Sequence, residues 1–441
     1  MTRKSECKLI RNQLKYKKLY PAYLRMLYTL NREYRVKKEH SFSDLVNFKT
    51  NKEIPRHNWF FYKQGYSEKL VSELLLKEKP PKTRYVLDPF TGVGTTNLVA
   101  KSLGYRSIGL DINPVATFAA KVKTTTFSKQ EINKINTMIK LFSPTKKSQI
   151  IPISPLLERS FSKIAFNKLM HIKRFFESIK DKKIASFFKL AYLSIIEDCS
   201  NRIKDGNGLK IAMNKRKIRD IYSFYINKCK VMVNDIYRLN SGKKPIIING
   251  SILLKEHFDK IKDKKVGIVI FSPPYLNCFD YCEVYKLELW MGGFVNNYED
   301  FKKYRTMAVR SHVNSEFNHC IQNPNAKVKL ISETISCFNI WNKNIPDMIE
   351  GYFDDMTKMF KKLHFLMVKG GKCFIVIANS GYKGVLVPTD LLLADIAKMN
   401  GFKVASVIYA RKIRASSQQM NELHNTYKNL IRESIVVLEK K

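Results

Sequence analysis

The sequence predicts an α/β protein in which a sheet with helices on both faces is interrupted by a mainly helical insert. Three observations lead to this prediction. From Arg84 onward, short apolar runs alternate with helical patterns and a Gly-rich turn. Residues 125–245 then carry Phe and Ile at spacings of three to four, which is typical of helices. Strand-like runs resume near residue 246 and continue toward the C-terminus.

The expected elements follow from local sequence. "RYVLDPF" is a strand that enters a Gly-rich turn, "TTNLVAKSLG" is a helix that ends at Gly104, and "RSIGLDINP" is a second strand. After the insert, five strand-like runs follow: "KPIIINGSI", "VGIVIFSPPY", "GGKCFIVIAN", "FKVASVIYA" and "RESIVVLEK". We therefore expect a basic helical arm at 1–40, a sheet domain made of 41–124 and 246–441, and an insert at 125–245.

Charge is the strongest global signal. The 441 residues include 79 Lys and Arg against 38 Asp and Glu, which gives a net charge of +41. Binding to a phosphate backbone accounts for such an excess, because each neutralised phosphate releases counterions. Residues 1–40 contain 12 basic and 3 acidic residues with interleaved tyrosines. This arm either packs on the protein body as a solvated helix or faces nucleic acid.

The remaining composition narrows the class of protein. None of the eight cysteines forms a CxxC pair, so we expect reduced thiols and no metal site. No apolar run reaches the roughly 20 residues that span a bilayer. The N-terminal "MTRKSECKLI" lacks the apolar core of a secretory signal. We expect a soluble, cytoplasmic protein.

The Gly-rich turn "VLDPFTGVGTTNLVA" indicates a nucleotide-type cofactor. Gly92 and Gly94 lie between a strand and a helix start, where the backbone approaches ligands closely. Asn97 stands where a dinucleotide-binding motif needs its third glycine, and the chain has no P-loop sequence. Asp88, directly before the turn, would repel pyrophosphate but attract an ammonium or sulfonium group. Asp111 ends the next strand and suits both ribose hydroxyls. These properties fit S-adenosylmethionine and indicate methyl transfer.

Three motifs resemble those of the amino-methylating DNA methyltransferases, which modify N4 of cytosine or N6 of adenine. They are "DPFTGVGTT" (88–96), "GLDINP" (109–114) and "SPPY" (272–275). Weaker support comes from "HNWFFYKQGYSEKLVSELL" (57–75), "MVKGGKCFIVIANS" (367–380) and "RESIVVLEK" (432–440). The resemblance leaves the insert unmatched. It implies a Rossmann-like methyltransferase sheet, S-adenosylmethionine as cofactor, double-stranded DNA with one flipped base as substrate, and a possible cognate restriction endonuclease.

The resemblance also assigns site residues. The expected cofactor-binding residues are Tyr62, Asp88, Pro89, Phe90, Gly92, Gly94, Thr95, Thr96, Asp111, Ile112 and Asn113. The chain departs from the family at one point. The strand before "SPPY" usually ends in Gly-Asp-Ser, but here it reads Asn249-Gly250-Ser251, so an acidic contact is missing or shifted.

The "SPPY" turn is expected to carry the chemistry. An exocyclic amine is a poor nucleophile because its lone pair is conjugated into the ring. The Ser272 side chain and the Pro273 carbonyl can accept its two N–H bonds at fixed geometry. Pro274 stiffens the turn, and Tyr275 can stack on a base extruded from the duplex. Ser272, Pro273, Pro274 and Tyr275 are therefore the expected catalytic residues.

The choice of target base remains open between two amines. Ser272 and the acid missing at Gly250 favour N4 of cytosine, while N6 of adenine stays the alternative. An RNA base methyltransferase and an inactive DNA-binding subunit are further alternatives. Methylation at cytosine C5 is disfavoured, because none of the 15 prolines precedes a cysteine, so the usual Pro-Cys nucleophile is absent.

The insert is the expected target-recognition domain. Residues 125–245 contain 26 basic and 9 acidic residues, and "NRIKDGNGLKIAMNKRKIRD" (201–220) is their most suggestive stretch, with a loop at Gly206 and Gly208. The expected DNA-binding residues are Arg202, Lys210, Lys215, Arg216, Lys217 and Arg219. Arg216 and Arg219 are expected on one helical face toward base edges, and the lysines toward phosphates. The alternatives are a scaffold insert, or DNA reading by 282–345 through Arg305 and Arg310.

Overall fold

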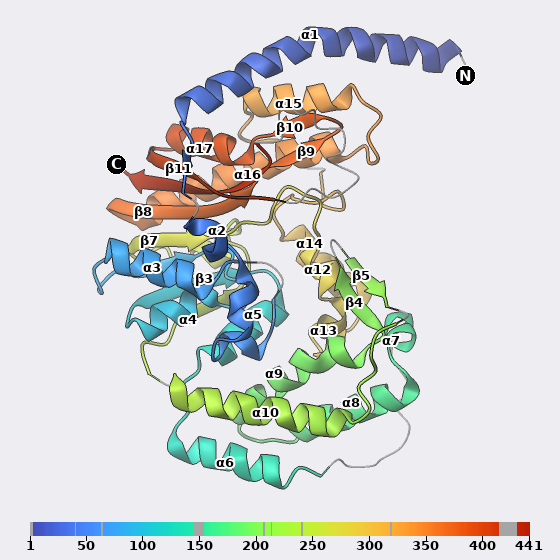
Figure 1. Cartoon of the computed structure of the whole chain (residues 1–441), viewed down its shortest axis with the longest axis vertical. Helices are drawn as coiled ribbons and strands as arrows, with labels where there is room; N and C mark the ends of the chain where they lie inside the picture. The colour runs from blue at the N-terminus through green and yellow to red at the C-terminus, as the bar shows by residue number, and fades with distance from the viewer. Residues whose placement is uncertain are drawn as a thin grey trace.

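The computed structural model describes residues 3–39, 41–62, 65–143, 154–205, 208–212, 214–239, 241–317, 320–413 and 430–441. Its centre is an eight-stranded sheet with the strand order β1-β11-β12-β8-β7-β2-β3-β6 (Figure 1). The strands are β1 (Lys37–Lys38), β2 (Tyr85–Asp88), β3 (Arg106–Asp111), β6 (Ile246–Asn249), β7 (Val266–Phe271), β8 (Met367–Ala378), β11 (Phe402–Lys412) and β12 (Arg432–Lys440).

Five neighbouring strands of this sheet run parallel. Strand β2 pairs with β3 and β7, β3 pairs with β6, and β7 pairs with β8, all in parallel register. Strand β12 is antiparallel to both β8 and β11. Because the chain reverses only in β12, strands β2, β3, β6 and β7 present their carboxyl ends at one edge of the sheet. Ligands of open α/β sheets bind at that edge.

Helices cover both faces of the sheet. In β7, which is buried throughout, Ile268 and Ile270 pack in the cluster formed with α3 (Glu68–Glu78) and α4 (Thr95–Ser102). Val269 and Phe271 face the opposite way, into the cluster formed with α16 (Ile345–Leu366) and α17 (Thr389–Met399). The alternation follows from the two-residue period of a strand. The predicted α/β fold is confirmed.

Local capping signals fix where the helices begin. The Ser67 hydroxyl accepts from Leu70 N at the start of α3, and the Asn113 side chain caps α5 (Pro114–Lys123). Ser128 and Glu131 form a capping box at α6 (Lys129–Lys140). Asp220 accepts two backbone N–H bonds at the start of α10 (Ile221–Arg238). Short polar side chains placed before apolar runs thus define these ends.

The described residues of the range 125–245 are mainly helical. It holds α6, α7 (Pro155–Ser160), α8 (Lys163–Glu177), α9 (Lys182–Cys199) and α10. Between α9 and α10 lies an antiparallel hairpin, β4 (Arg202–Asp205) with β5 (Gly208–Ile211). The helices share one apolar cluster with α5 and with α13 (Lys286–Met291). The insert therefore packs on the sheet domain through a continuous core.

Two parts of the chain complete the structure. The segment after β7 contains α12 (Tyr281–Val284), α13, α14 (Tyr298–Thr306) and α15 (Ala326–Ser336). The remaining short elements are α2 (Phe42–Leu45), the 3-10 turns η1 (Phe48–Lys52) and η2 (His57–Trp59), α11 (Lys255–Phe258), and the small sheet of β9 (Ser380–Tyr382) and β10 (Val385–Val387). In the described ranges, no helix is both long and apolar enough to cross a membrane.

The basic N-terminal arm is one helix, α1 (Arg3–Glu33), which lies along the sheet domain beside α15 and α17 (Figure 1). Tyr23 is fully buried, and its hydroxyl both donates to Leu386 O at 3.1 Å and accepts from Leu386 N at 3.0 Å. The Tyr34 hydroxyl donates to Asp395 on α17. The inner face of α1 therefore packs on the protein body, which is one of the two interpretations of this arm.

The anchoring role of Tyr23 is testable. Tyr23→Phe leaves both backbone groups of Leu386 without their partner, so we expect the free energy of unfolding to fall by about 1–3 kcal/mol in denaturant titrations. The matched control is Tyr28→Phe on the exposed side of α1, which is expected to stay within about 0.5 kcal/mol of the parent. Equal stability of the Tyr23→Phe and parent proteins would show that the contact does not anchor the helix.

Candidate active site

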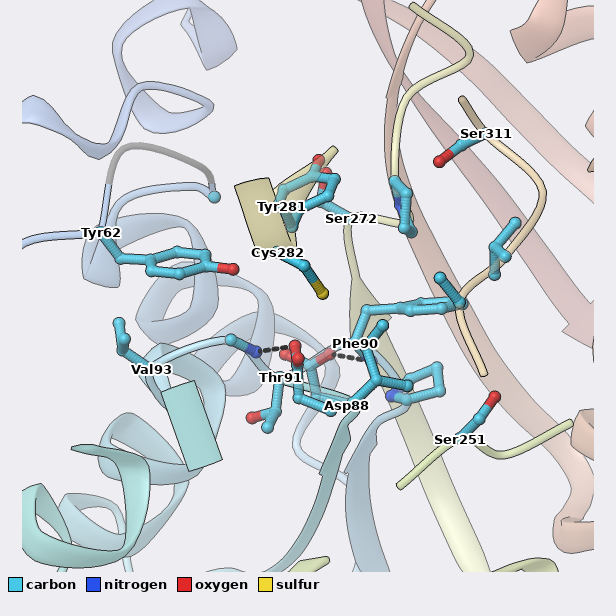
Figure 2. Close-up of a pocket in the computed structure, with 18 of the residues that line it drawn as sticks. Tyr62, Asp88, Phe90, Thr91, Val93, Ser251, Ser272, Tyr281, Cys282 and Ser311 are labelled. Carbon is cyan, nitrogen blue, oxygen red and sulfur yellow. Dashed lines mark hydrogen bonds between the residues drawn. The ribbon is translucent and has the colours of Figure 1, made fainter. Parts of the chain in front are cut away.

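A pocket lies at the carboxyl edge of the parallel strands (Figure 2). The loops after β2, β3, β6 and β7 form its floor, and its walls come from Tyr62 with Gly65 and Tyr66, from residues 280–282 and from the segment 307–312. Ten predicted site residues line it: Tyr62, Asp88, Pro89, Phe90, Gly92, Thr95, Asp111, Ile112, Ser272 and Pro274. The fold thus brings eight of the eleven residues predicted for the cofactor to one place with Ser272 and Pro274, two of the four predicted for catalysis.

Asp111 is held by two backbone donors. Its Oδ2 accepts from Gly92 N at 2.9 Å, and its Oδ1 accepts from Asn113 N at 2.8 Å. Burial raises the pKa of this carboxyl to about 6, against the lowering effect of those two hydrogen bonds. Each oxygen keeps a lone pair for a further donor, so the carboxylate can accept two neighbouring hydroxyl groups.

Asp88 is almost fully buried at the end of β2. Its Oδ1 accepts from Phe90 N at 3.0 Å, and its Oδ2 accepts from the Tyr66 hydroxyl at 2.8 Å. Burial raises the pKa of Asp88 to about 7, even though hydrogen bonds from Thr96, Tyr66 and Phe90 lower it. A buried carboxyl with a raised pKa gains from a cationic ligand, because the cation favours its charged form.

Gly92 and Gly94 are needed in the turn for different structural reasons. A Cβ at Gly92 would lie 3.3 Å from the Tyr62 ring, and Gly92 adopts φ +50°, so glycine keeps the pocket open beside Tyr62. Gly94 does not line the pocket. A Cβ there would lie 2.8 Å from Ala120 Cβ, so Gly94 lets α4 pack closely on α5. The sequence-based reason given for Gly94, a close approach to a ligand, is replaced by helix packing.

Two more predicted cofactor residues lie behind the pocket wall. Thr96 is buried and lies 2.6 Å from the Tyr66 hydroxyl, and Asn113 caps α5 through Val115 N. Thr96 therefore orients the hydroxyl that binds Asp88, and Asn113 supports the turn that binds Asp111. Neither side chain lines the pocket itself.

The "SPPY" turn follows β7 directly, and its residues Ser272 and Pro274 line the pocket. Figure 2 labels Ser272 there. Tyr275 lies beside it rather than in its lining, and its hydroxyl donates to Glu433 Oε1 at 2.6 Å. Burial and the charge of Glu433 raise the pKa of Tyr275 well above 10. The ring orientation of Tyr275 is therefore fixed from β12, and Tyr281 is the tyrosine of this region that lines the pocket.

Tyr62 forms a wall that reaches into the insert. Its ring stacks on that of Tyr285, with centroids 4.7 Å apart and planes 11° from parallel. The Nζ of Lys204, on the β4–β5 hairpin, lies 4.6 Å from the centre of the Tyr285 ring. That Nζ pairs with Glu288 and, at 3.0 Å, with Glu197. A buried lysine of the insert thus supports the aromatic stack beside the pocket.

The missing acid at residue 250 has a structural counterpart. Gly250 and Ser251 line the pocket, but Gly250 adopts φ +156° and a Cβ there would lie 2.4 Å from the His257 imidazole. His257 thus occupies the space that an acidic side chain would need. Sequence reasoning missed Tyr66, Tyr281 and the segment 307–312, because these residues reach the pocket only through the fold.

The predicted DNA-binding residues are spread over the hairpin and the segment after it. Arg202 Nε donates to Ser160 Oγ, Lys210 pairs with Asp205, and Lys215 Nζ donates to the carbonyls of Glu197 and Arg202. The expected helical face is wrong, because the described residues 214–220 are not helical and α10 begins only at Ile221. Arg216, Lys217 and Arg219 are exposed there. Gly206 lies outside the described residues, and Gly208 begins β5.

Of the alternative DNA-reading residues, Arg305 is partly buried and Arg310 is buried. Arg305 pairs with Asp280 at 2.7 Å and with Glu283 at 2.9 Å. Arg310 is buried against two aspartates of α16. Both guanidinium groups thus pair with carboxylates of the chain itself, and DNA reading by 282–345 stays a prediction.

Comparisons with known proteins agree with this geometry. A family model described as DNA methylase matches residues 6–122. Type II methyltransferase M.BsoBI of Geobacillus stearothermophilus is 28% identical, over 90% of this chain and 88% of its own length. Type II methyltransferase M.AvaI of Nostoc sp. is 24% identical, over 90% and 89%. The chain is thus similar to amino-methylating DNA methyltransferases, to the relatives over most of its length and to the family model over its first part. Its methyl donor is S-adenosylmethionine.

The pocket fits this cofactor. The two remaining acceptor positions of Asp111 suit a ribose diol, and the raised pKa of Asp88 suits a ligand that carries ammonium and sulfonium charges. Gly92 leaves room next to Tyr62 where any side chain would narrow the pocket. Asp111, Asp88 and Tyr62 are therefore the residues that would hold the cofactor, with Gly92 giving backbone access.

Cofactor affinity should depend on pH through Asp88. Its pKa of about 7 in the free protein leaves mostly the neutral acid at pH 6 and mostly the carboxylate at pH 8. Because the cationic ligand binds the ionised form of Asp88, we expect the Kd for S-adenosylmethionine to be about 10-fold higher at pH 6 than at pH 8. Calorimetry at the two pH values measures this change.

The Asp88→Asn variant is the matched control for that titration. It should bind more weakly at pH 8 and retain only the smaller pH dependence that comes from Asp111 and its pKa of about 6. A parent protein whose affinity is constant from pH 6 to pH 8 would contradict the role of Asp88.

Proposed function

We propose that this enzyme is a site-specific methyltransferase that methylates N4 of cytosine in double-stranded DNA, within a restriction–modification system. The observation that carries the proposal is the placement of Ser272 in one pocket with Asp88 and Asp111. A methyl acceptor held by the "SPPY" turn would then lie beside the bound cofactor. The similarity to named Type II methyltransferases supports the association with restriction–modification.

The chain's own groups would prepare the amine for reaction. The Ser272 hydroxyl and the Pro273 carbonyl would accept hydrogen bonds from the two N–H groups of the amine. These bonds draw the nitrogen lone pair out of conjugation with the ring. When bound, S-adenosylmethionine would supply the methyl group from a positively charged sulfur that becomes a neutral thioether, and the methylated amine would release one proton. Tyr275, oriented by Glu433, is the proposed stacking partner of the extruded base.

Cytosine is preferred over adenine because the amine-binding turn is neutral. Residue 272 is a serine, and in the family that this chain resembles, serine at this position is commoner among N4-cytosine members than among N6-adenine members. At Gly250, where many adenine enzymes of the family carry an acid, His257 fills the space. Nucleoside mass spectrometry of DNA from a host expressing the protein, together with modification-sensitive sequencing, gives both the base and the recognition sequence. N6-methyladenine in place of N4-methylcytosine would overturn the choice.

Ser272 is expected to act on the reacting amine rather than on binding. Ser272→Ala should lower kcat on the order of 100-fold, with little change in the affinity for DNA or cofactor. The matched control is Ser178→Ala at the exposed end of α8, which should keep full turnover. Normal turnover of Ser272→Ala would remove the serine from the mechanism.

The exposed basic segment after the hairpin is the proposed phosphate contact. Replacing Arg216, Lys217 and Arg219 by alanine should weaken DNA binding and reduce the slope of log K against log salt by up to about 3, since each lost phosphate contact removes roughly 0.9. Cofactor affinity should not change.

The control for that experiment uses the other basic region. Lys17, Lys18 and Arg25 are exposed on α1, which lies across the molecule from the hairpin (Figure 1). Their triple alanine variant should keep the parent salt slope. If the α1 variant loses the slope and the hairpin variant keeps it, DNA binds at the N-terminal arm and the insert is a scaffold.

A further inference from the structure

The segment from Met307 to His312 has one side chain that behaves differently from the others. Met307, Ala308, Val309, Ser311 and His312 line the pocket, whereas Arg310 in their midst points into the protein. The segment comes from the region after α14 and contains no helix or strand after Thr306. Something other than regular secondary structure must therefore hold it against the pocket.

Arg310 supplies that hold. Its backbone N and its Nε both donate to Asp355 Oδ2 at 3.0 Å, and its Nη2 donates to Asp355 Oδ1 at 2.6 Å and to Asp354 Oδ2 at 2.8 Å. The guanidinium is buried, and the paired aspartates belong to α16. A buried, planar guanidinium that donates several hydrogen bonds to carboxylates is held in one orientation. Residue 310 is thus fixed relative to α16.

The sequence of α16 is adapted to this arginine. Gly351 lies in the middle of the helix, where glycine is less favourable than alanine. A Cβ at Gly351 would lie 2.9 Å from Arg310 Cδ, so the glycine makes room for the side chain. Asp354 is held in turn by Asn323 and Lys358. The anchor is therefore a built feature of several elements rather than a surface ion pair.

The anchored segment is attached to the catalytic side of the pocket. The Cys278 N–H, three residues after the "SPPY" turn, donates to Ser311 O at 3.2 Å. Figure 2 shows the Ser311 hydroxyl turned toward the side of the pocket where Ser272 and Tyr281 lie. Ser311 and His312 are 1% and 3% exposed, so neither contacts bulk solvent. These two side chains face the place where the target base is proposed to bind.

His312 is a hydrogen-bonding group rather than a charge. Burial lowers its pKa, the nearby Asp280 raises it and Arg305 lowers it, with a net lowering that keeps the imidazole neutral. Its Nδ1 lies 3.4 Å from Ser315 Oγ. A neutral imidazole offers one donor and one acceptor, and the serine hydroxyl can also donate.

Extrusion of a cytosine leaves two ring acceptors to be satisfied. The N4 amine is taken by Ser272 and Pro273, but N3 and O2 lose their donors on the partner guanine. An unpaired buried acceptor is unfavourable, so the pocket needs donors at the ring edge. We propose that Ser311 and His312 donate to the ring edge of the extruded base, and that Arg310 is the positioning residue that holds both there. This inference rests on the proposed function, because it adds contacts to the same base.

The contact is tested on the recognition duplex identified by modification mapping. His312→Leu, which removes the donor, should lower kcat/KM for DNA about 10-fold while the KM for S-adenosylmethionine stays within about 2-fold. His312→Gln keeps a donor and should retain about a third of the parent value. The matched control is Asn314→Ala, an exposed neighbour that should behave as the parent protein. Parent-like kinetics of His312→Leu, or an equal rise in the cofactor KM, would overturn the proposal.

The positioning role is tested by base extrusion itself. A duplex with 2-aminopurine at the target position gains fluorescence when that base leaves the stack and enters the protein. Arg310→Met should bind duplex and cofactor but give less than half of the parent fluorescence gain, and Arg310→Lys should recover part of it. Full gain and full turnover in Arg310→Met would exclude the positioning role.

The outcomes distinguish a failure of the proposed function from a failure of the proposed contact with the base. If the parent protein methylates no DNA, the proposed function fails and the extrusion experiment has no substrate. If the parent methylates DNA, the His312 pair decides the contact even where Arg310→Met is too unstable to bind cofactor, because both His312 variants leave the ion pairs of Arg310 intact. Loss of activity in His312→Leu with rescue in His312→Gln supports the contact, and equal loss in both variants overturns it.

Discussion

One buried hydroxyl group joins the cofactor side of the site to the catalytic side. The oxygen of Tyr66 lies 2.8 Å from Asp88 Oδ2, 2.6 Å from Thr96 Oγ1 and 3.2 Å from the carbonyl of Ile270. These partners belong to the end of β2, the first turn of α4 and the last residues of β7. Ser272 follows Ile270 by two residues. The distance between Asp88 and the "SPPY" turn therefore depends on the hydrogen bonds of the Tyr66 hydroxyl. Burial raises the pKa of Tyr66 far above 10, so the phenol keeps its proton.

The walls of the pocket extend this constraint to parts of the chain that the sheet does not contain. The insert reaches Tyr62 through Lys204, Glu288 and the Tyr285 ring. A buried ion pair of this kind is weak as a source of net stability, but removal of one partner leaves an uncompensated charge. The proposed DNA-reading unit and the cofactor pocket therefore share a side-chain network. The segment 307–312 closes the opposite wall through Arg310 and the two aspartates of α16.

The strands and the cofactor motifs were predictable from sequence because their signals are local. Apolar runs define β2, β3 and β7, and the acids that end the first two strands precede recognisable turns. The hairpin β4–β5 was not predicted, because two four-residue strands carry little periodicity and a loop was expected around Gly208. The misplaced helix at Arg216 had a usable signal, since Asp220 before "IYSF" marks the true helix start.

The pocket walls could not be predicted for a different reason. Tyr281 and His312 carry no motif of their own, and Tyr66 lies in the weaker stretch 57–75 without any sign of its role; all three approach the site only when the chain is folded. Arg310 was named only as an alternative DNA-reading residue, because the sequence shows its charge but not its partners. Asp354 and Asp355 lie more than forty residues away, and only the fold reveals that they bury the arginine.

The most direct measurement is a crystal structure of the protein with S-adenosylhomocysteine and its recognition duplex. The account predicts the ribose hydroxyls on Asp111, the sulfur on the side of the pocket toward Ser272, and an extruded base whose exocyclic amine donates to Ser272 Oγ and Pro273 O. A cofactor bound away from Asp111, or a target base stacked in the duplex while the pocket is occupied by other groups, would contradict the claim that one pocket unites cofactor and target.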